Sequence, residues 1–200
     1  MFCQDFVTSF CFNGIMEPKK WMSEKDIILK SKHLGPMVED AFYQERMMLL
    51  KLTDKEKFDY MVSKMNYCKR KEYSSGKAMG LNVNKGDLAY IDFSQAYQHE
   101  IGYLHFGLVM TVKRGKAFVV PLSGKYKAYL EAYDNKENPT GKRHLMRLGY
   151  IEGLTKVSVL FINDSKWINT SRIIEIKAHI DENGEMFKEV QKRIIEMIIE

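Results

Sequence analysis

Cysteine is scarce in this chain, which excludes two classes of small scaffold. Only Cys3, Cys11 and Cys68 occur among 200 residues, and no CxxC or Cys/His spacing joins them. A disulfide framework needs an even set of cysteines, and a structural zinc site needs closely spaced ligand pairs. We therefore expect free or buried thiols in a reducing compartment, with no metal site and no cofactor.

Long apolar runs are also lacking. No stretch approaches the roughly 18 apolar residues of a membrane-spanning helix, and residues 1–21 lack the basic start of a secretory signal. The sequence thus predicts a cytoplasmic protein without a membrane partner. Its net charge of +5 favours an anionic partner, and 45% hydrophobic residues over 200 positions suffice for one domain with an appendage.

The first third of the chain has helical periodicity. Residues 37–52 carry apolar side chains near helical spacing, and Thr53 with Glu56 forms a capping box that starts a further helix. An apolar stripe on this last helix is interpreted as packing against the barrel, the other helices or a partner chain; it contains Phe58, Met61, Val62 and Met65. Basic residues around the Ser/Gly stretch 74–76 then predict a mobile linker: Lys69, Arg70, Lys71 and Lys77.

The stretch from Gly86 to Gly124 predicts three strands. Residues 87–93 alternate apolar and polar side chains, while residues 105–112 and the stretch ending at Ser123 contain short apolar runs. A tight turn at residues 113–116 joins the second strand to the third, because Gly115 permits the backbone that such a turn needs.

Polar side chains gather where these strands end. A loop with Gln98, His99 and Glu100 precedes the second strand, which begins at His105, and Ser123 closes the third strand. Loop and strand ends are where functional side chains usually lie. His105 and Ser123 are therefore the main candidates for a site, although both residue types are also common in purely structural roles.

Short motifs follow one another in a fixed order along the second half of the chain. They are Gly86-Asp87 with Asp92-Phe93, Glu100-x-Gly102, a buried second strand, and Val120-Pro121-Leu122-Ser123; further on come residues 158–164, Lys166, Ile168 and Ser171-Arg172. This order resembles the MazF/PemK family of toxin endoribonucleases. The resemblance covers about residues 85–200, with an untypically long segment between the third strand and Ser158.

The resemblance implies both a fold and a function. The fold would be α+β: a small SH3-like β-barrel of the MazF/PemK/CcdB type over residues 85–200, with a C-terminal helix, preceded by a helical N-terminal extension and basic linker over residues 1–84. The function would be that of the toxin of a type II toxin-antitoxin system: a metal-independent endoribonuclease, a hydrolase that cleaves single-stranded RNA such as mRNA. A homodimer and a cognate antitoxin protein are the implied partners.

The chain departs from the family at one catalytic position. Where the family has Arg-Pro before the second strand, this chain has His105-Phe106. A histidine, with an ordinary pKa of about 6.5, transfers protons near neutrality, whereas an arginine is a permanent cation. The resemblance thus assigns catalysis to His105, Ser123 and Glu100, with His105 as acid or base and Ser123 as a donor to phosphate.

Basic residues near these positions are candidates for substrate binding. They are Lys113, Arg114, Lys142, Arg143 and Arg147. The last three follow a stretch rich in tyrosine, and cations interleaved with aromatic rings suit single-stranded nucleic acid. A strand pair with an exposed hairpin is the alternative reading of that stretch.

Two other functions stay open. A catalytically inactive relative of the same fold would bind RNA or a protein. A gyrase inhibitor of this fold would act through a C-terminal tryptophan, which the ending Ile198-Ile199-Glu200 does not provide.

Overall fold

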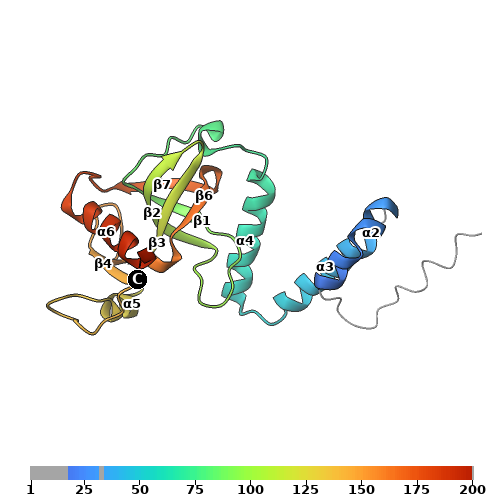
Figure 1. Ribbon diagram of the computed structural model, residues 1–200, viewed down its shortest axis with the longest axis horizontal. Coiled ribbons are helices and arrows are strands. Elements are labelled where there is room, and N and C mark those ends of the chain that lie inside the picture. Colours follow the sequence, from blue (N-terminus) through green and yellow to red (C-terminus); the bar gives the residue numbers. More distant parts are fainter. Residues whose placement is uncertain (1–17, 32–33, 200) are drawn as a thin grey trace, which may run out of the picture. The chain divides into compact units, whose positions relative to one another are not determined.

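The computed structural model describes residues 18–31 and 34–199 (Figure 1). The chain divides into two compact units, Met1–Lys57 and Phe58–Glu200. The sequence places its boundary near Lys85, whereas the helix that begins at Asp54 continues into the second unit. Cys3 and Cys11 lie outside the described residues, and Cys68 is an exposed free thiol.

The described part of the first unit is helical. It contains α1 (Pro18–Ser23), α2 (Lys25–Ser31), α3 (Gly35–Leu49) and the first turn of α4 (Asp54–Arg70). The predicted capping box is confirmed, because Thr53 N donates to Glu56 Oε2 at 2.8 Å and Glu56 N donates to Thr53 Oγ1 at 3.3 Å. Each side chain thus satisfies a backbone donor that the helix itself leaves unpaired.

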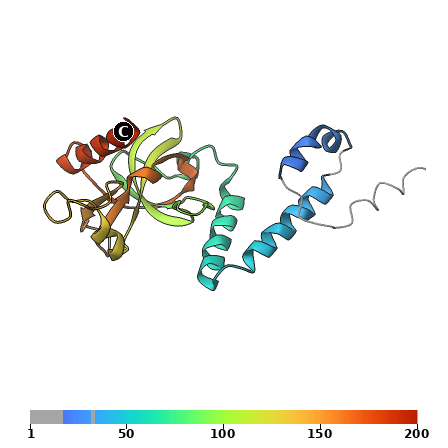
Figure 2. The same ribbon diagram turned by 60° about the horizontal axis from the view of Figure 1, so that its bottom comes forward.

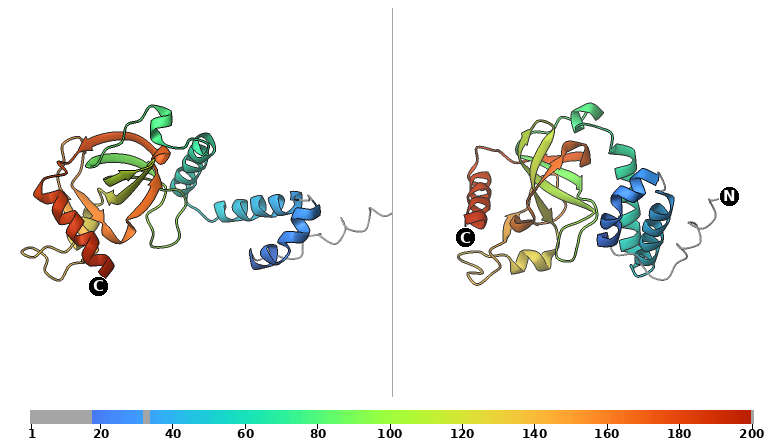
Figure 3. Two further views of the ribbon diagram at one scale, coloured as in Figure 1. Left: turned by 45° about the horizontal axis from the view of Figure 1, so that its top comes forward. Right: turned by 45° about the vertical axis from the view of Figure 1, so that its right-hand side comes forward.

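The second unit is built on a curved antiparallel sheet (Figure 3). Its strands are β1 (Asp87–Asp92), β2 (Leu104–Lys113), β3 (Lys116–Ser123), β4 (Leu145–Gly149), β5 (Ser158–Phe161), β6 (Lys166–Asn169) and β7 (Ile173–His179). Their order is β4-β5-β3-β2-β1-β7, and β6 pairs with the first half of β3 while β5 pairs with its end. With α6 (Glu185–Ile199), the unit has the expected α+β class.

The β2–β3 turn has the predicted tight geometry. Arg114 and Gly115 connect the strands with φ values of +50° and +76°. Two successive left-handed residues match the twist of a hairpin, and glycine adopts this conformation without steric cost.

The two sides of the sheet carry separate hydrophobic clusters. One cluster contains Leu108, Val120 and Leu160 together with Phe187 and Val190 of α6, all of them fully buried. The other contains Ile91, Val109, Val119 and Ile173. Helix α6 therefore closes one side of the sheet with the apolar face that its sequence predicts.

Helix α4 lies on the side of the sheet opposite α6 (Figures 1 and 2). It is attached by polar contacts, since Ser63 and Asn66 both donate to the carboxylate of Asp92 at 2.7 Å. Its apolar stripe is exposed: Phe58 by 68%, Met61 by 46% and Met65 by 60%. The prediction that this stripe packs in the core is wrong for these three side chains, whereas Val62 is half-buried; the buried residues of α4 are Tyr60 and Ser63.

The stretch that follows α4 is packed. Gly76 begins the short helix η2 (Gly76–Met79), is buried, and donates its N–H to Thr170 Oγ1 at 2.8 Å. Thr170 Oγ1 in turn donates to the carbonyl of Gly115. The Ser/Gly content of residues 74–76 thus reflects a close contact with the hairpin tip rather than the mobility that it predicts.

The long segment after β3 contains a helix. Helix α5 (Tyr126–Glu131) is followed by irregular chain up to β4. The buried residues Ala132, Leu145 and Val159 form a small third cluster beneath it. This segment brings Lys125, directly after β3, and the residues just before β5 to the same end of the sheet.

Candidate active site and nucleic-acid groove

The loop between β1 and β2 forms one wall of the candidate site. It is closed at its base, because Phe93 N donates to Tyr103 O at 2.8 Å and Tyr103 N donates to Ser94 O at 2.6 Å. Glu100 lies exposed on this loop, where its Oε2 accepts from Tyr97 N at 3.2 Å. Two of the predicted residues, Glu100 and His105, are therefore held at the same end of the sheet.

His105 and Ser123 are brought together by the β2–β3 ladder. Phe106 pairs with Leu122 in this antiparallel ladder, so extending the register by one residue sets His105 opposite Ser123. Opposed residues of an antiparallel pair point to the same side of the sheet, with Cβ atoms about 5 Å apart. The two main candidates from the sequence thus face the same region, where His105 is half-buried and Ser123 is 9% exposed.

A backbone carbonyl determines which nitrogen of His105 carries hydrogen when the ring is neutral. Nδ1 lies 2.8 Å from the carbonyl oxygen of Gly102. Because a carbonyl only accepts, Nδ1 is the donor, and the lone pair of the neutral ring is on Nε2. His105 is therefore oriented to accept a proton at Nε2.

Asp164 is a second proton-transfer candidate at this end of the sheet. Burial raises the pKa of its carboxyl group, and the nearby charge of Glu100 raises it further, against the opposing effects of Lys166, the backbone N–H of Ile101 and His144. A carboxyl group with a raised pKa is a better proton donor near neutrality. The sequence shows Asp164 only as part of a motif, because the burial that shifts its pKa depends on the folded loop.

Lys166 supplies a cation to the same region. It pairs with Val119 across the β6–β3 ladder, and its Nζ lies 5.8 Å from the centre of the Phe93 ring. The positive charge of Lys166 also acts on Asp164, where it lowers the pKa of the carboxyl group against the effect of burial. Asp164 and Lys166 thus lie beside the β1–β2 loop, which carries Glu100 and leads to His105.

A basic groove begins at Ser123. It has a volume of about 800 Å³, and its lining includes Ser123, Lys125, Tyr126, Lys156 and Lys177. All of its lining residues belong to the described part of the chain; three are lysines and none is acidic. The groove can therefore hold an anionic chain, although Lys177 also contacts Glu175 at 2.8 Å.

Aromatic rings stand beside this groove. Tyr126 is 63% exposed and stacks on Tyr129, with ring centres 6.3 Å apart and planes 8° from parallel. Exposed ring faces next to cations are the usual platform for the bases of single-stranded nucleic acid. The sequence did not single out Lys125, Lys156 or Lys177, because these residues come from three distant segments and only the fold makes them neighbours.

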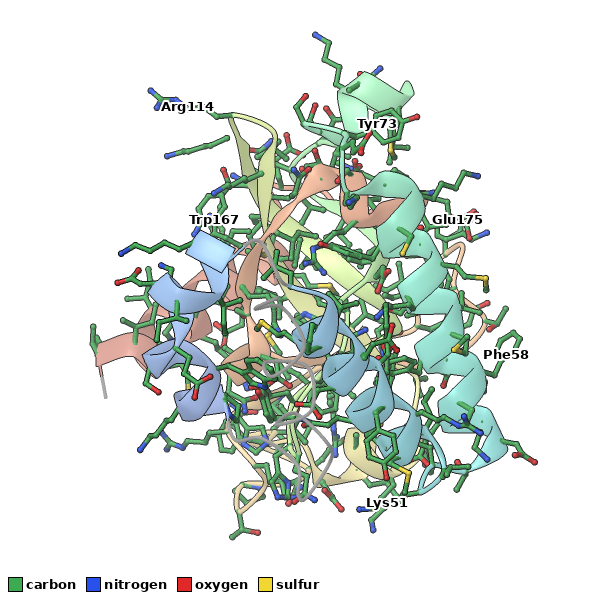
Figure 4. The ribbon with its side chains drawn as sticks, turned by 90° about the vertical axis from the view of Figure 1, so that its right-hand side faces the viewer. Lys51, Phe58, Tyr73, Arg114, Trp167 and Glu175 are labelled. Atoms are coloured by element: carbon green, nitrogen blue, oxygen red, sulfur yellow. The ribbon has the colours of Figure 1, made fainter. Side chains whose placement is uncertain are left out.

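Lys113 and Arg114 lie far from the site. They are at the tip of the β2–β3 hairpin (Figure 4), and eight strand residues beyond His105 correspond to about 26 Å. This tip instead contacts the stretch before η2, where a Cβ on Gly115 would approach Ser75 to 3.0 Å. The structure therefore does not bring these two predicted substrate-binding residues to His105 and Ser123.

The basic cluster before and in β4 has intramolecular partners. Lys142 Nζ contacts Glu131 at 2.7 Å, and Arg147 donates to Tyr129 O at 2.9 Å and to Glu137 at 2.6 Å. Arg143 lies 5.5 Å from the centre of the Tyr133 ring. These three side chains hold the segment after α5 in place, which gives them a structural role besides any contact with substrate.

Across residues 18–31 and 34–199, no group of three or more His, Cys, Asp or Glu side chains could hold a metal ion. Among the same residues, no helix is long and apolar enough to cross a membrane.

Comparison with known proteins identifies structural rather than sequence relatives. No family model and no curated protein matches the chain. The chain is similar in structure to crystallised MazF (Form-I) from Deinococcus radiodurans, with 15% identity over 59% of this chain and 97% of that one and a TM-score of 0.44. It is also similar to the MazE-MazF structure (Form-II) from the same organism, with 15% identity, coverage of 58% and 95%, and a TM-score of 0.40. It is similar as well to the Mycobacterium tuberculosis toxin MazF-mt6, with 10% identity over 56% of this chain and 91% of that one and a TM-score of 0.35.

Proposed function

We propose that this protein is a metal-independent endoribonuclease that cleaves single-stranded RNA and acts as the toxin of a toxin-antitoxin pair. The observation that carries the proposal is the position of His105 opposite Ser123, because Ser123 also lines a groove that contains three lysines. The motif order in the sequence supports the same activity. The groove supplies binding, and the strand ends supply proton transfer.

The reaction is an attack by the ribose 2′-hydroxyl on the adjacent phosphorus. His105 Nε2 takes the proton from this hydroxyl, the bond from O2′ to phosphorus forms, and the bond from phosphorus to O5′ breaks. Asp164, whose pKa is raised by burial, acts as the general acid and gives a proton to the departing O5′. The products are a 2′,3′-cyclic phosphate and a 5′-hydroxyl, and each proton passes through a side chain of the required type.

Charge that develops on the phosphorane oxygens needs donors and cations. Ser123 Oγ donates to one of these oxygens and itself accepts from the backbone N of Lys125 at 3.3 Å. The side chain of Lys125 adds positive charge from the groove. Lys166 acts from the other side of the site. Such stabilisation is stronger in the transition state than in the ground state because the negative charge increases there.

The assembly belongs to the same proposal. As the family resemblance implies, the chain forms a symmetric homodimer and is held inactive by a cognate antitoxin. Light scattering at micromolar concentration tests the first part, and a monomer there contradicts it. Loss of RNA cleavage on addition of a co-expressed antitoxin tests the second part.

The decisive experiment is incubation of the pure full-length protein with a long unstructured RNA in EDTA, followed by mapping of the new ends. We expect cleavage that leaves a cyclic phosphate and a 5′-hydroxyl. Cleavage that requires an added divalent ion contradicts the mechanism. RNA that is bound but never cut identifies the protein as a binding relative of the same fold, and the His105→Ala variant serves as the background control.

A further inference from the structure

Helix α4 carries an apolar stripe on the face turned away from the sheet. The stripe consists of Phe58, Met61, Met65 and Cys68, and Phe58 projects outward in Figure 4. Phe58, Met61 and Met65 are exposed by 68%, 46% and 60%, and Cys68 is exposed. At about 100° per residue, all four lie within about 40° of the direction opposite Ser63.

The opposite face of α4 is fixed to the sheet. Ser63 is 1% exposed and donates to Asp92, and Asn66 donates to the second oxygen of the same carboxylate. Arg70 donates to the carbonyls of Ser171 and Ile173 at 3.3 and 2.8 Å. Rotating the stripe inward would break these contacts and leave a buried carboxylate without its donors, so the stripe is held in its outward position.

The charges that flank the stripe are basic. Lys64 and Lys71 lie along one side of it and Lys69 along the other, by their positions on the helical wheel. Between Phe58 and Lys71 the single acidic residue is Asp59, which lies toward the face attached to the sheet; Asp54 and Glu72 lie in line with the stripe, beyond its two ends. An apolar centre between basic edges is complementary to a surface with an apolar centre and acidic edges.

We propose that this face of α4 docks an acidic amphipathic helix of a partner protein. The partner places apolar side chains at helical spacing against Phe58, Met61 and Met65, and its carboxylates lie beside Lys64, Lys69 and Lys71. A second copy of α4 fits poorly, because its own lysines would lie against these lysines. This inference does not depend on the nuclease activity, since the face is separate from His105 and Ser123.

The test uses a fluorescein-labelled peptide of about three heptads, with Leu at helical spacing and Glu elsewhere, and the full-length protein. A peptide with Lys in place of each Glu is its matched control. We expect the Glu peptide to raise its fluorescence anisotropy on binding, the Lys peptide to bind at least tenfold more weakly, and the affinity of the Glu peptide to fall with added salt. Equal binding of both peptides, or no binding of the Glu peptide, overturns the proposal.

Two sets of variants locate the binding on α4. Phe58→Ser with Met65→Ser should weaken binding about tenfold or more, as expected for apolar anchors at the centre of an interface. Ile198→Ser, at an isoleucine of α6 that is 76% exposed, should leave it unchanged. Lys69→Glu with Lys71→Glu should shift the preference toward the Lys peptide, and does so without altering the apolar stripe.

Other ligands are tested in the same assay. Two other ligands are offered to the parent protein and to the Phe58→Ser/Met65→Ser variant. One is a vesicle that contains anionic lipid, and the other is a single-stranded RNA oligomer. If the substitutions reduce binding of vesicles while the Glu peptide does not bind, the face is a membrane contact and the proposal fails. Melting curves of all variants should match the parent, because every substituted side chain is exposed.

Discussion

Ser63 Oγ donates a hydrogen bond of 2.7 Å to Asp92 Oδ1, which joins α4 to the last residue of β1. Asn66 and the backbone N–H of Ser94 donate to the same carboxylate. Asp92 is 3% exposed, so these donors take the place of water at its carboxylate. Because the β1–β2 loop starts directly after Asp92, this contact also fixes the chain that leads to His105.

Replacing Ser63 by Ala should destabilise the second unit. The substitution removes one donor from a buried carboxylate, which costs about 1–3 kcal/mol in the free energy of unfolding. Urea denaturation of the parent and of Ser63→Ala measures the difference. Ser74→Ala, at an exposed serine, is the control and should change the free energy by less than about 0.5 kcal/mol. A change that small in Ser63→Ala would show that the contact does not hold α4.

Replacing His105 by Ala should lower the rate of RNA cleavage on the order of 10²-fold or more, the usual contribution of a general base. The parent rate should rise with pH and then level off, because a general base acts in its neutral form. Ser123→Ala should cost less, since its hydroxyl only donates to phosphate.

Two further variants at histidine positions sharpen this prediction. His105→Arg should be inactive but folded, because an arginine cannot accept the proton; retained activity would show that the position needs only charge. His99→Asn is the matched control on the neighbouring loop, where the φ of +70° suits asparagine. An unchanged rate in His105→Ala with a parental melting curve would assign His105 a structural role.

Lys125→Gln should weaken RNA binding more than Lys113→Gln. Lys125 lines the groove beside Ser123, whereas Lys113 is at the far end of the β2–β3 hairpin. Loss of one phosphate contact to a single strand should lower the slope of log affinity against log salt by about 0.7. Both effects are measured by filter binding of RNA over a series of salt concentrations, with each lysine variant made in a catalytically inactive form of the protein. A larger loss of RNA affinity in Lys113→Gln than in Lys125→Gln would instead indicate that the RNA binds at the hairpin tip.

Asp164→Asn should raise the melting temperature at pH 7. Burial raises the pKa of Asp164, so the folded state binds this proton more tightly than the unfolded state, and ionisation opposes folding. The gain should grow as the pH rises above the ordinary carboxyl pKa of about 3.9 and vanish below it. Asp134→Asn is the opposite control, because backbone N–H groups of Glu137 and Lys136 lower the pKa of Asp134. In thermal melts from pH 3 to 8, the melting temperature of Asp164→Asn should therefore rise above that of the parent, and the melting temperature of Asp134→Asn should fall below it.

His179→Gln should destabilise the protein at pH 6 but not at pH 9. A hydrogen bond of 2.9 Å to Asp87 raises the pKa of His179, and Glu182 at 3.3 Å adds to this effect. The stabilisation is complete below the unfolded pKa of about 6.5 and is lost as the pH rises through the higher folded value. Melting temperatures measured across this range check the sign. A constant difference between variant and parent would mean that His179 contributes only by packing.

The local features of the fold could be predicted from the sequence. The first strand, the Arg114-Gly115 turn, the capping box at Thr53 and the apolar face of α6 all depend on neighbours close in the chain, and all are present in the structure. The strand is nevertheless buried on both faces, although residues 87–93 alternate apolar and polar side chains. The pairing of His105 with Ser123 does not follow from the turn alone. A bulge between Val109 and Thr111 shifts the β2–β3 register by one residue, and the register next to the turn would instead set His105 opposite Gly124.

The surroundings of the site were decided by tertiary structure alone. The hydrophobic pattern of α4 favours burial of Phe58 and Met65, yet the helix buries Tyr60 and Ser63, and Ser63 donates to Asp92 on a distant strand. Charge counts cannot tell which cations are paired, and Arg147 is paired while Lys125 lines a groove. Such outcomes depend on contacts between residues far apart in the chain, whereas the periodicity of a sequence reports only on contacts that are near.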